Sequence, residues 1–390
     1  MSNYLKNIKN SFKLKHYFNY MGVGFVLVLF SALYYAGALN RSTPNLLTQI
    51  GYSIILAVSL NLVVGLLGEL SLGHAGFMCV GSYVGATLAN ALIGKMPIIV
   101  VFLLSALVGG ATAALFGFIV GLPALRLRGD YLAIVTLAFG EIIRNVCKNL
   151  PFFGGAQGLA SETYSEYLKL GQRAIPLFIP TFIAVLFMLF VVQNLIRSKH
   201  GRAITAIRDN EIAAKAMGIN VTYYKLFVFV VSAFFAGVIY MGTTSPIQYS
   251  FFSYNYSIEI LVMVVLGGMG SISGSIISAA LITYINFALK SMLSGDMAAV
   301  KTLVYALILI LMVIYKNAPA LKGVRDRFNL NVLKSSIKAK VFKVKDKASD
   351  INDDAGEWDE IPTKIITDEV LSTDLALTNY KPDKPDKAEK

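Results

Sequence analysis

Ten stretches rich in apolar residues recur along this 390-residue sequence, and their length constrains its fold more than any other feature. The hydrocarbon core of a bilayer is about 30 Å thick, and a helix that crosses it needs roughly 20 apolar residues. Because no water reaches that core, the backbone polar groups must be paired within each helix. The sequence therefore predicts an all-α, polytopic transmembrane helical bundle of about 8–10 spans, some of them broken or re-entrant. The expected spans are 20–39, 45–66, 76–92, 97–122, 131–146, 176–196, 222–241, 256–266, 271–289 and 300–314.

Composition argues against an ordinary soluble domain, because 56% of the residues are hydrophobic and only 15% are charged, compared with about 25% charged residues in soluble proteins. The net charge of +12 can indicate a nucleic-acid partner, but here the basic residues gather in particular loops. That distribution is typical of membrane orientation, so we expect a lipid bilayer and no nucleic acid as partner. We expect the N- and C-termini to be cytoplasmic.

Three parts of the chain differ in character. Residues 1–19 are basic and are expected to be cytoplasmic, and the full-length apolar span after them is expected to stay as an anchor. Residues 20–315 form the predicted transmembrane domain. Residues 316–390 form a charged cytoplasmic tail, which we expect to be mostly disordered. Trp358 lies in an acidic stretch of this tail, where a spacer is favoured over a short binding motif.

The loop 199–225 is charged and helix-prone, and it lies between two apolar spans. We expect an amphipathic helix about three turns long, capped by Asp209 or Asn210. Glu211 is expected to pair with Lys215 one turn later, and Gly218 to end the helix. Such a helix offers a grip for a soluble partner, whereas the alternative is an ordinary interfacial helix.

Small and apolar residues shape the surface of that expected helix. The side chains of Ala213 and Ala214 are short and project little from the helix, so that another protein can approach its backbone closely. Ile212, Ala216 and Ile219 share one face at helical spacing.

Two Gly-rich segments, 65–86 and 265–284, occur where helices are expected to cross. Broken helices in two halves of a chain often mark a transport pathway, although close packing of small residues is the alternative. Glu69 and His74 are close enough in sequence to share a hydrogen bond, either along a pathway or as a structural or solvated contact. The candidate pathway residues are Glu69, Ser71, His74, Gly267, Gly268 and Ser271.

The other ionisable residues of the spans point to structural roles. Glu141 and Arg144 are three residues apart on an expected helix and are predicted to form an ion pair. Asp130 follows Gly129 at a helix start, where it is expected to be the N-cap. Glu259 opens a span, and the sequence indicates no function for it.

Motifs for catalysis are not found in this sequence. It contains no Walker A pattern, Gly-x-Ser-x-Gly elbow, dinucleotide fingerprint or cluster of metal ligands. Cys79 and Cys147 lack metal-ligand spacing and are expected to be inert packing residues. We therefore predict no catalytic residue, no metal site and no enzyme, so that any energy for pumping must come from another chain or an ion gradient.

A family resemblance rests on five stretches of sequence taken together. The loop reads EIAAKAMGIN (211–220), and the others are GLLGELSLGHAGFMCVGSYVGA (65–86), LRLRGDYLAIVTLAFGEIIRNV (125–146), GGAQGL (154–159) and IEILVMVVLGGMGSISG (258–274). The loop resembles the coupling loop of bacterial ABC importer permeases, although Ile212 is an extra residue in its core and no Leu-Pro follows. In this form the chain is similar to branched-chain amino-acid importer permeases, of the longer M-type.

The resemblance implies that the chain is a non-catalytic subunit of an ATP-driven importer in a bacterial plasma (inner) membrane. Its partners would be a second homologous permease, a cytoplasmic ABC ATPase dimer and an extracytoplasmic substrate-binding protein. It implies no cofactor on this chain, with ATP and Mg on the partner ATPase. The residues expected to couple to the ATPase are Arg208, Asp209, Glu211, Ala213, Ala214, Lys215 and Gly218.

The expected cargo is a branched-chain or other apolar amino acid. An importer of urea or short-chain amides is the alternative within the same class. In a different class, an ion-gradient-driven transporter is the alternative, and it would carry facing charges deep in several spans. A structural membrane scaffold would leave the loop and the broken segments without a role.

Overall fold

The computed structural model describes residues 18–37, 42–127, 129–160, 176–238 and 246–292, together with positions 306, 307 and 310. The chain divides into two units, 1–318 and 319–390. The second unit lies outside the described residues, and so do the basic segment 1–17 and, apart from those three positions, the predicted span 300–314. The expectation of a disordered tail over 316–390 likewise falls on residues outside the description.

The described part is helical, and its only β pairing is an isolated bridge between Leu159 and Ile247. The helices are α2 (Phe18–Tyr35), α3 (Thr43–Asn61), α4 (His74–Leu92), α5 (Ile98–Ala124), α6 (Asp130–Asn149), α8 (Phe178–Arg197), α9 (Lys199–Asp209), α10 (Glu211–Ala216), α11 (Val221–Gly237), α12 (Tyr254–Gly267) and α13 (Ile272–Met292). Shorter elements are the π-helix η2 (Leu62–Leu67) and the 3-10 turns η3 (Pro151–Phe153), η4 (Gly155–Gln157) and η7 (Tyr249–Phe252). The predicted all-α bundle is confirmed.

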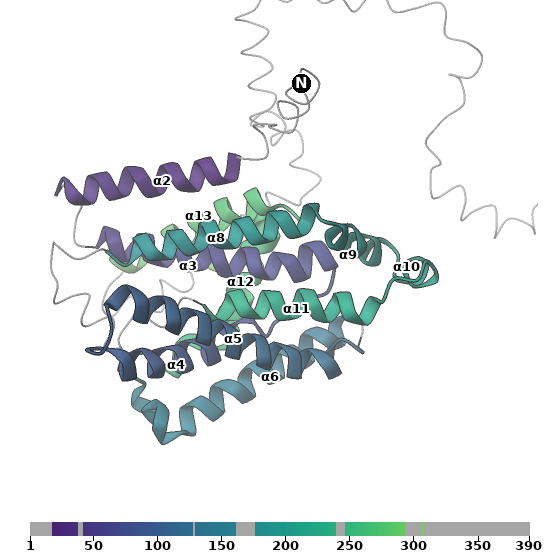
Figure 1. Cartoon of the computed structure of the whole chain (residues 1–390), viewed down its shortest axis with the longest axis horizontal. Coiled ribbons are helices and arrows are strands. Elements are labelled where there is room, and N and C mark those ends of the chain that lie inside the picture. The colour runs from purple at the N-terminus through teal and green to yellow at the C-terminus, as the bar shows by residue number, and fades with distance from the viewer. Residues whose placement is uncertain are drawn as a thin grey trace, which may run out of the picture. The chain divides into compact units, whose positions relative to one another are not determined.

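Five helices are long and apolar enough to cross a membrane, by their length and composition. They are Thr43–Leu67, His74–Leu92, Ile99–Ala124, Phe178–Arg197 and Ile272–Leu289. Three shorter apolar helices, Asn19–Tyr35, Val221–Gly237 and Tyr254–Gly267, lie in the same bundle. Figure 1 shows these helices side by side, with α9 and α10 at one end of the bundle.

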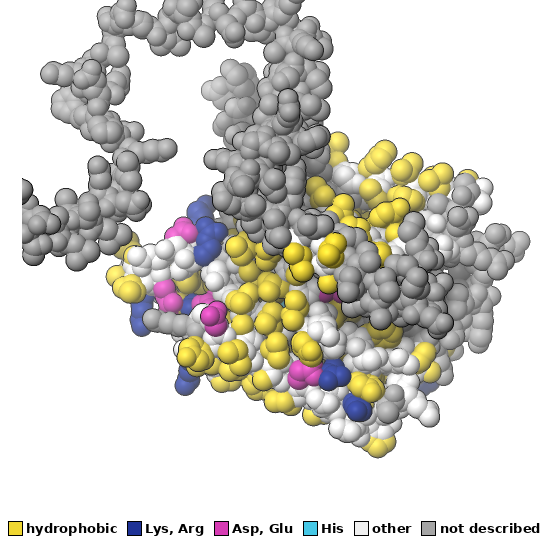
Figure 2. Space-filling view, turned by 180° about the vertical axis from the view of Figure 1, so that it is seen from behind, with side chains coloured by type: hydrophobic (Ala, Val, Ile, Leu, Met, Phe, Trp, Pro, Cys, Tyr) yellow, Lys and Arg dark blue, Asp and Glu magenta, His cyan; other side chains and the backbone are white. Residues whose placement is uncertain are grey.

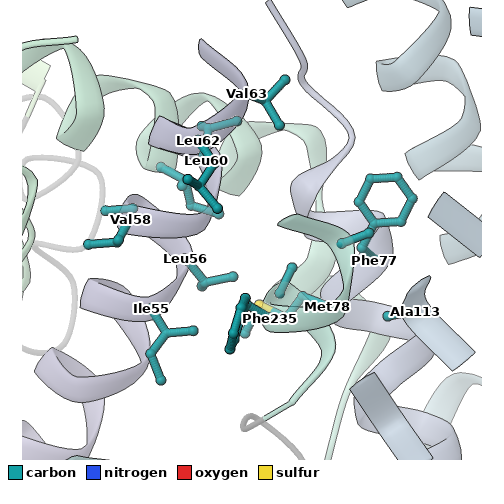
Figure 3. Packing of buried hydrophobic residues seen from close by; sticks show 14 of the residues in the cluster. Ile55, Leu56, Val58, Leu60, Leu62, Val63, Phe77, Met78, Ala113 and Phe235 are labelled. Atoms are coloured by element: carbon teal, nitrogen blue, oxygen red, sulfur yellow. The ribbon is translucent and has the colours of Figure 1, made fainter. Parts of the chain in front are cut away.

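Helix α3 lies at the centre of this bundle. Together with η2 it forms a segment of 25 residues, Thr43–Leu67. In its most apolar stretch, 89% of the residues are buried. A helix that is apolar on all sides is expected in the interior, and α3 packs against α8, α11, α12 and α13. Figure 3 labels Ile55, Leu56 and Val58 of α3 among the residues of the buried core, together with Phe77 of α4 and Phe235 of α11.

Helices α4, α5 and α11 approach one another through three glycines. A Cβ on Gly81 of α4 would overlap the backbone of Gly237 of α11, and a Cβ on Gly109 of α5 would lie 2.6 Å from the carbonyl oxygen of Gly81. Without a hydrophobic driving force between helices in lipid, close backbone approach supplies the packing contacts that hold them together. The three glycines therefore set the spacing of these helices.

We predict that Gly81→Val destabilises the folded chain by about 1–3 kcal/mol or more, because the added side chain must push α11 away. The measurement is the melting temperature of the detergent-solubilised protein. Gly22→Val on α2 is the matched control, since a Cβ at Gly22 has no neighbour within 4 Å. Equal melting temperatures for the two variants would contradict the packing argument.

Candidate functional site

The first break in the bundle follows α3. The π-helix η2 ends at Gly68, whose φ of 83° is a left-handed conformation that suits glycine. Residues 69–73 are not helical, and α4 begins at His74. The break retains some backbone pairing, since the Glu69 N–H donates to the Val63 carbonyl at 3.1 Å.

The second break separates α12 from α13. Helix α12 ends at Gly267, and Gly268 and Gly270 have φ values of 98° and 82°. Ser271 accepts a hydrogen bond from the Gly274 N–H through its Oγ, at 3.2 Å, just before α13. Both Gly-rich segments of the sequence therefore contain interrupted helices, as predicted.

Asn61 joins the two breaks. Its Oδ1 accepts from the Gly270 N–H at 2.8 Å, and its Nδ2 donates to Ser275 Oγ at 3.0 Å. The backbones also meet, because a Cβ on Gly65 would overlap Gly270. Candidate pathway segments some 200 residues apart in sequence are thus brought together, and the residue that joins them was missed by the sequence analysis. A buried Asn shortly before a Gly-rich break was the available signal.

The loop 199–225 contains two helices where the sequence analysis expected one. Ser198 caps α9, and Asn210 caps α10 by accepting from the Ala213 N–H at 2.9 Å. The extended backbone of Asn210 ends α9 and starts α10, so that α10 has only six residues instead of about three turns. Asp209 does not cap α10 and instead forms an ion pair with Arg208 at 2.9 Å.

Apolar side chains project from α10 into solvent. Ile212 is 78% exposed, and Met217, just after the helix, is 83% exposed. Ala214 is buried, whereas Ala213 is exposed on the surface.

Gly218 has a φ of 80° and ends the helix, as predicted. Lys215 and Ala216 are also exposed, while Ile219 is half-buried. The face that Ile212, Ala216 and Ile219 were predicted to share is therefore only partly exposed to solvent.

Lys225 connects the loop to the first break. Its Nζ lies 2.6 Å from Glu69 Oε1 and 3.2 Å from Glu211 Oε2, and the Lys225 side chain is 6% exposed. The sequence analysis expected Lys215 as the partner of Glu211 and did not identify Lys225. A lysine five residues into an otherwise apolar helix was a signal, because such a charge is retained only where it is paired.

Arg208 makes a second connection to the same break. Its Nη1 donates to the Gly65 carbonyl at 3.2 Å. The carbonyls of a π-helix next to a break have fewer backbone partners than those of a regular helix, and a guanidinium can satisfy them. At one end of the segment 65–69, Arg208 of α9 therefore contacts Gly65 directly. At the other end, Glu211 of α10 is linked to Glu69 through Lys225 of α11.

His74 belongs to a separate buried polar cluster. Its Nε2 lies 3.2 Å from Ser59 Oγ and 3.1 Å from Ser232 Oγ, so the hydrogen bond to Glu69 that the sequence spacing allowed is not formed. Glu69 turns to Lys225 because that cation compensates its charge. Ser71 is fully buried, and its Oγ has no hydrogen-bond partner among the described residues.

The ion pair predicted on α6 is confirmed. Arg144 lies 2.6 Å from Glu141, and Glu141 Oε1 also accepts from the Tyr254 N–H at the start of α12. The predicted cap is wrong, since Gly129 occupies the N-cap position and Asp130 is the first residue of the helix. Its carboxylate there still faces the positive end of the helix dipole.

Charged side chains concentrate at the end of the bundle that carries α9 and α10. Figure 2 shows them there, with apolar side chains over the middle of that face.

Among the described residues no group of three His, Cys, Asp or Glu side chains is placed to hold a metal ion. Cys79 and Cys147 are both free and buried. The geometry of this site is therefore that of a charged junction between a surface helix and an interrupted core helix.

Comparisons with known proteins agree with this architecture. The family model described as "Branched-chain amino acid transport system / permease component" matches residues 42–314. The high-affinity branched-chain amino acid transport system permease protein LivM of Escherichia coli K12 is 36% identical over 287 residues, 66% of each chain. The LivM protein of Salmonella typhimurium is 36% identical over 273 residues, 62% of each chain.

A probable LivM protein of Methanocaldococcus jannaschii is 28% identical over 269 residues, 64% of this chain and 76% of that relative. The chain thus spans slightly less than two thirds of the length of the two enterobacterial relatives. No solved structure matches it.

We predict that Lys225→Met destabilises the chain by up to about 3 kcal/mol, because Glu69 and Glu211 then lose the ammonium group that both of them contact. The exposed fraction of Glu211, 35%, moderates the loss. Adding Glu69→Gln to Lys225→Met should restore part of the melting temperature. Asp209→Asn, in an exposed pair, is the control and should change stability by less than about 1 kcal/mol. A Lys225→Met protein that melts like the control would contradict the role of this cluster.

Proposed function

We infer the function of this chain from the family to which it belongs, the permease components of branched-chain amino acid transport systems. We propose that it is a transmembrane subunit of an ATP-driven importer for branched-chain or other apolar amino acids. Its multi-pass helical bundle fits that role. The names of its relatives support amino acids as cargo over urea or amides.

The observation that carries the proposal is the junction between α10 and the first break. Glu211, the first residue of α10, contacts Lys225, which in turn contacts Glu69 inside the break. A displacement of α10 by a partner is therefore applied directly to an interrupted core helix. Packed elements with two discrete arrangements are what transmit such coupling. An ion-gradient-driven transporter has no need of this link to a protruding surface helix.

The proposed partner at α10 is a cytoplasmic ATPase dimer, which would hold ATP and Mg²⁺. Exposed apolar anchors at a helix end are typical of a protein interface, and Ile212 and Met217 are such anchors. The end of the bundle with α9 and α10 is then cytoplasmic, as are the chain termini. A second homologous permease and an extracytoplasmic substrate-binding protein complete the proposed importer.

We predict that the tagged chain, purified from its own membranes in mild detergent, carries a P-loop ATPase and a second homologous permease. Ile212→Asp and Met217→Asp should each reduce the recovered ATPase about tenfold or more, since loss of a buried anchor costs roughly 2 kcal/mol. Recovery is measured by quantitative mass spectrometry.

Met96→Asp is the matched control for this experiment, because Met96 is 47% exposed in the connection between α4 and α5. It should leave the ATPase bound. If the folded wild-type chain comes down alone in several detergents, the importer proposal fails.

We predict that Glu69→Gln lowers uptake of radiolabelled L-leucine about tenfold or more while the ATPase stays bound, because one charge-assisted contact between α11 and the break is lost. Uptake is measured in cells lacking their own branched-chain importers. Asp130→Asn, an exposed carboxylate of α6, should leave uptake unchanged. Normal uptake by Glu69→Gln would show that motion does not pass through this contact.

A further inference from the structure

A polar pocket lies between α3, α12 and α13, away from the coupling junction. Its volume is about 220 Å³, and its polar residues include Gln49, Glu259, Thr283 and Asn286. Met263 and Phe287 add an apolar wall. Drug-sized pockets measure about 300–1,000 Å³, so this pocket is on the scale of a small metabolite. The three helices pack directly on one another, which gives it walls of regular structure.

Glu259 and Thr283 supply a carboxylate and a hydroxyl group to the lining of the pocket. Asn286 Nδ2 donates to Glu259 Oε1 at 3.3 Å, which orients the carboxylate. Thr283 is only 7% exposed, and its Oγ1 has no hydrogen-bond partner among the described residues. A buried hydroxyl without a partner costs about 1–3 kcal/mol, so such groups are normally satisfied by a ligand or an ordered water.

The position of the pocket relates it to the two breaks. Gln49 and Asn61 are twelve residues apart along α3, which corresponds to about 18 Å. Glu259 precedes Gly267 on α12 by eight residues, or about 12 Å. The helices that line the pocket thus also carry both breaks. Because Arg208 contacts the first break, the breaks lie between the pocket and the α9–α10 junction.

We propose that this pocket is a subsite for the head group of an α-amino acid with an apolar side chain. Glu259 binds the ammonium group, while Gln49 and Thr283 donate hydrogen bonds to the carboxylate. Met263 and Phe287 contact the side chain of the amino acid. This proposal rests on the proposed function and assigns a substrate site within it.

The test uses Ser53→Cys in membrane vesicles that contain the full chain with its partners. Ser53 is 3% exposed and lines the pocket, so we expect a reagent to reach the new thiol through the pocket. The two natural cysteines are replaced in the background, Cys79→Ala and Cys147→Ala, so that the introduced thiol is the one that is labelled. The neutral reagent methyl methanethiosulfonate should label Ser53→Cys, and near-saturating L-leucine should slow the labelling about tenfold, in proportion to the free fraction of sites.

Analogues and variants decide which group is recognised. 4-Methylpentanoate, which lacks the ammonium, and isoamylamine, which lacks the carboxylate, should each protect much less than L-leucine. Glu259→Gln should abolish protection by L-leucine but leave labelling intact. Asn149→Cys, exposed at the end of α6, is the control and should be labelled at the same rate with or without L-leucine.

Three results would overturn the proposal: no labelling of Ser53→Cys, no protection by L-leucine, or equal protection by isoamylamine, which indicates a simple cation site. The ligand series with Glu259 intact remains decisive even if Glu259→Gln fails to fold. The readout is independent of ATP. Loss of protection with the ATPase bound therefore rejects the subsite alone, whereas protection without any ATPase rejects the importer and leaves the subsite standing.

Discussion

The amide of Asn61 connects two places where the helical backbone of the core is interrupted, and the rest of the arrangement depends on this connection. An interrupted helix leaves N–H and C=O groups without intrahelical partners, and in an apolar interior each such group costs free energy. Asn61 offers both an acceptor and two donors, and it bonds to Gly270 and Ser275 across the bundle. The absence of a side chain at Gly65 lets the two backbones come close enough for these bonds.

A second polar connection runs from the surface to the same region. Lys225 is almost fully buried, and it is tolerated there because Glu69 and Glu211 both compensate its charge. Since Asn61, just before the segment 65–69, bonds to the second break, the cluster makes this segment a tether between α10 and the core. In the proposed importer this tether is the element on which a bound ATPase acts.

The proposed subsite and the coupling junction lie on opposite sides of the breaks. Helices α3, α12 and α13 carry the pocket at one level and the interruptions at another. Short, interrupted helices can rearrange at lower cost than continuous ones, because fewer hydrogen bonds must be exchanged. A substrate in the pocket and a partner at α10 would thus bias the same bistable element from two sides.

Local patterns in the sequence were sufficient to predict the helices and their interruptions. The length of the apolar stretches predicted the bundle, the glycines at 65–86 and 265–284 predicted the breaks, and Gly218 predicted the end of α10. These features follow from interactions within a few residues, which periodicity and backbone preferences describe. They also supported the ion pair between Glu141 and Arg144.

The partners of the buried polar groups were decided only by tertiary structure. Lys225 bonds to a residue 156 positions away, and Asn61 to one 209 positions away. Glu69 and His74 are close enough in sequence to share a hydrogen bond. Glu69 instead contacts Lys225 of α11, and His74 contacts Ser59 of α3 and Ser232 of α11. No local pattern encodes such pairings, since a buried charge takes whichever partner the packing of whole helices brings within reach. The sequence by itself determined where the helices stop, and the packing of those helices decided what their broken ends contact.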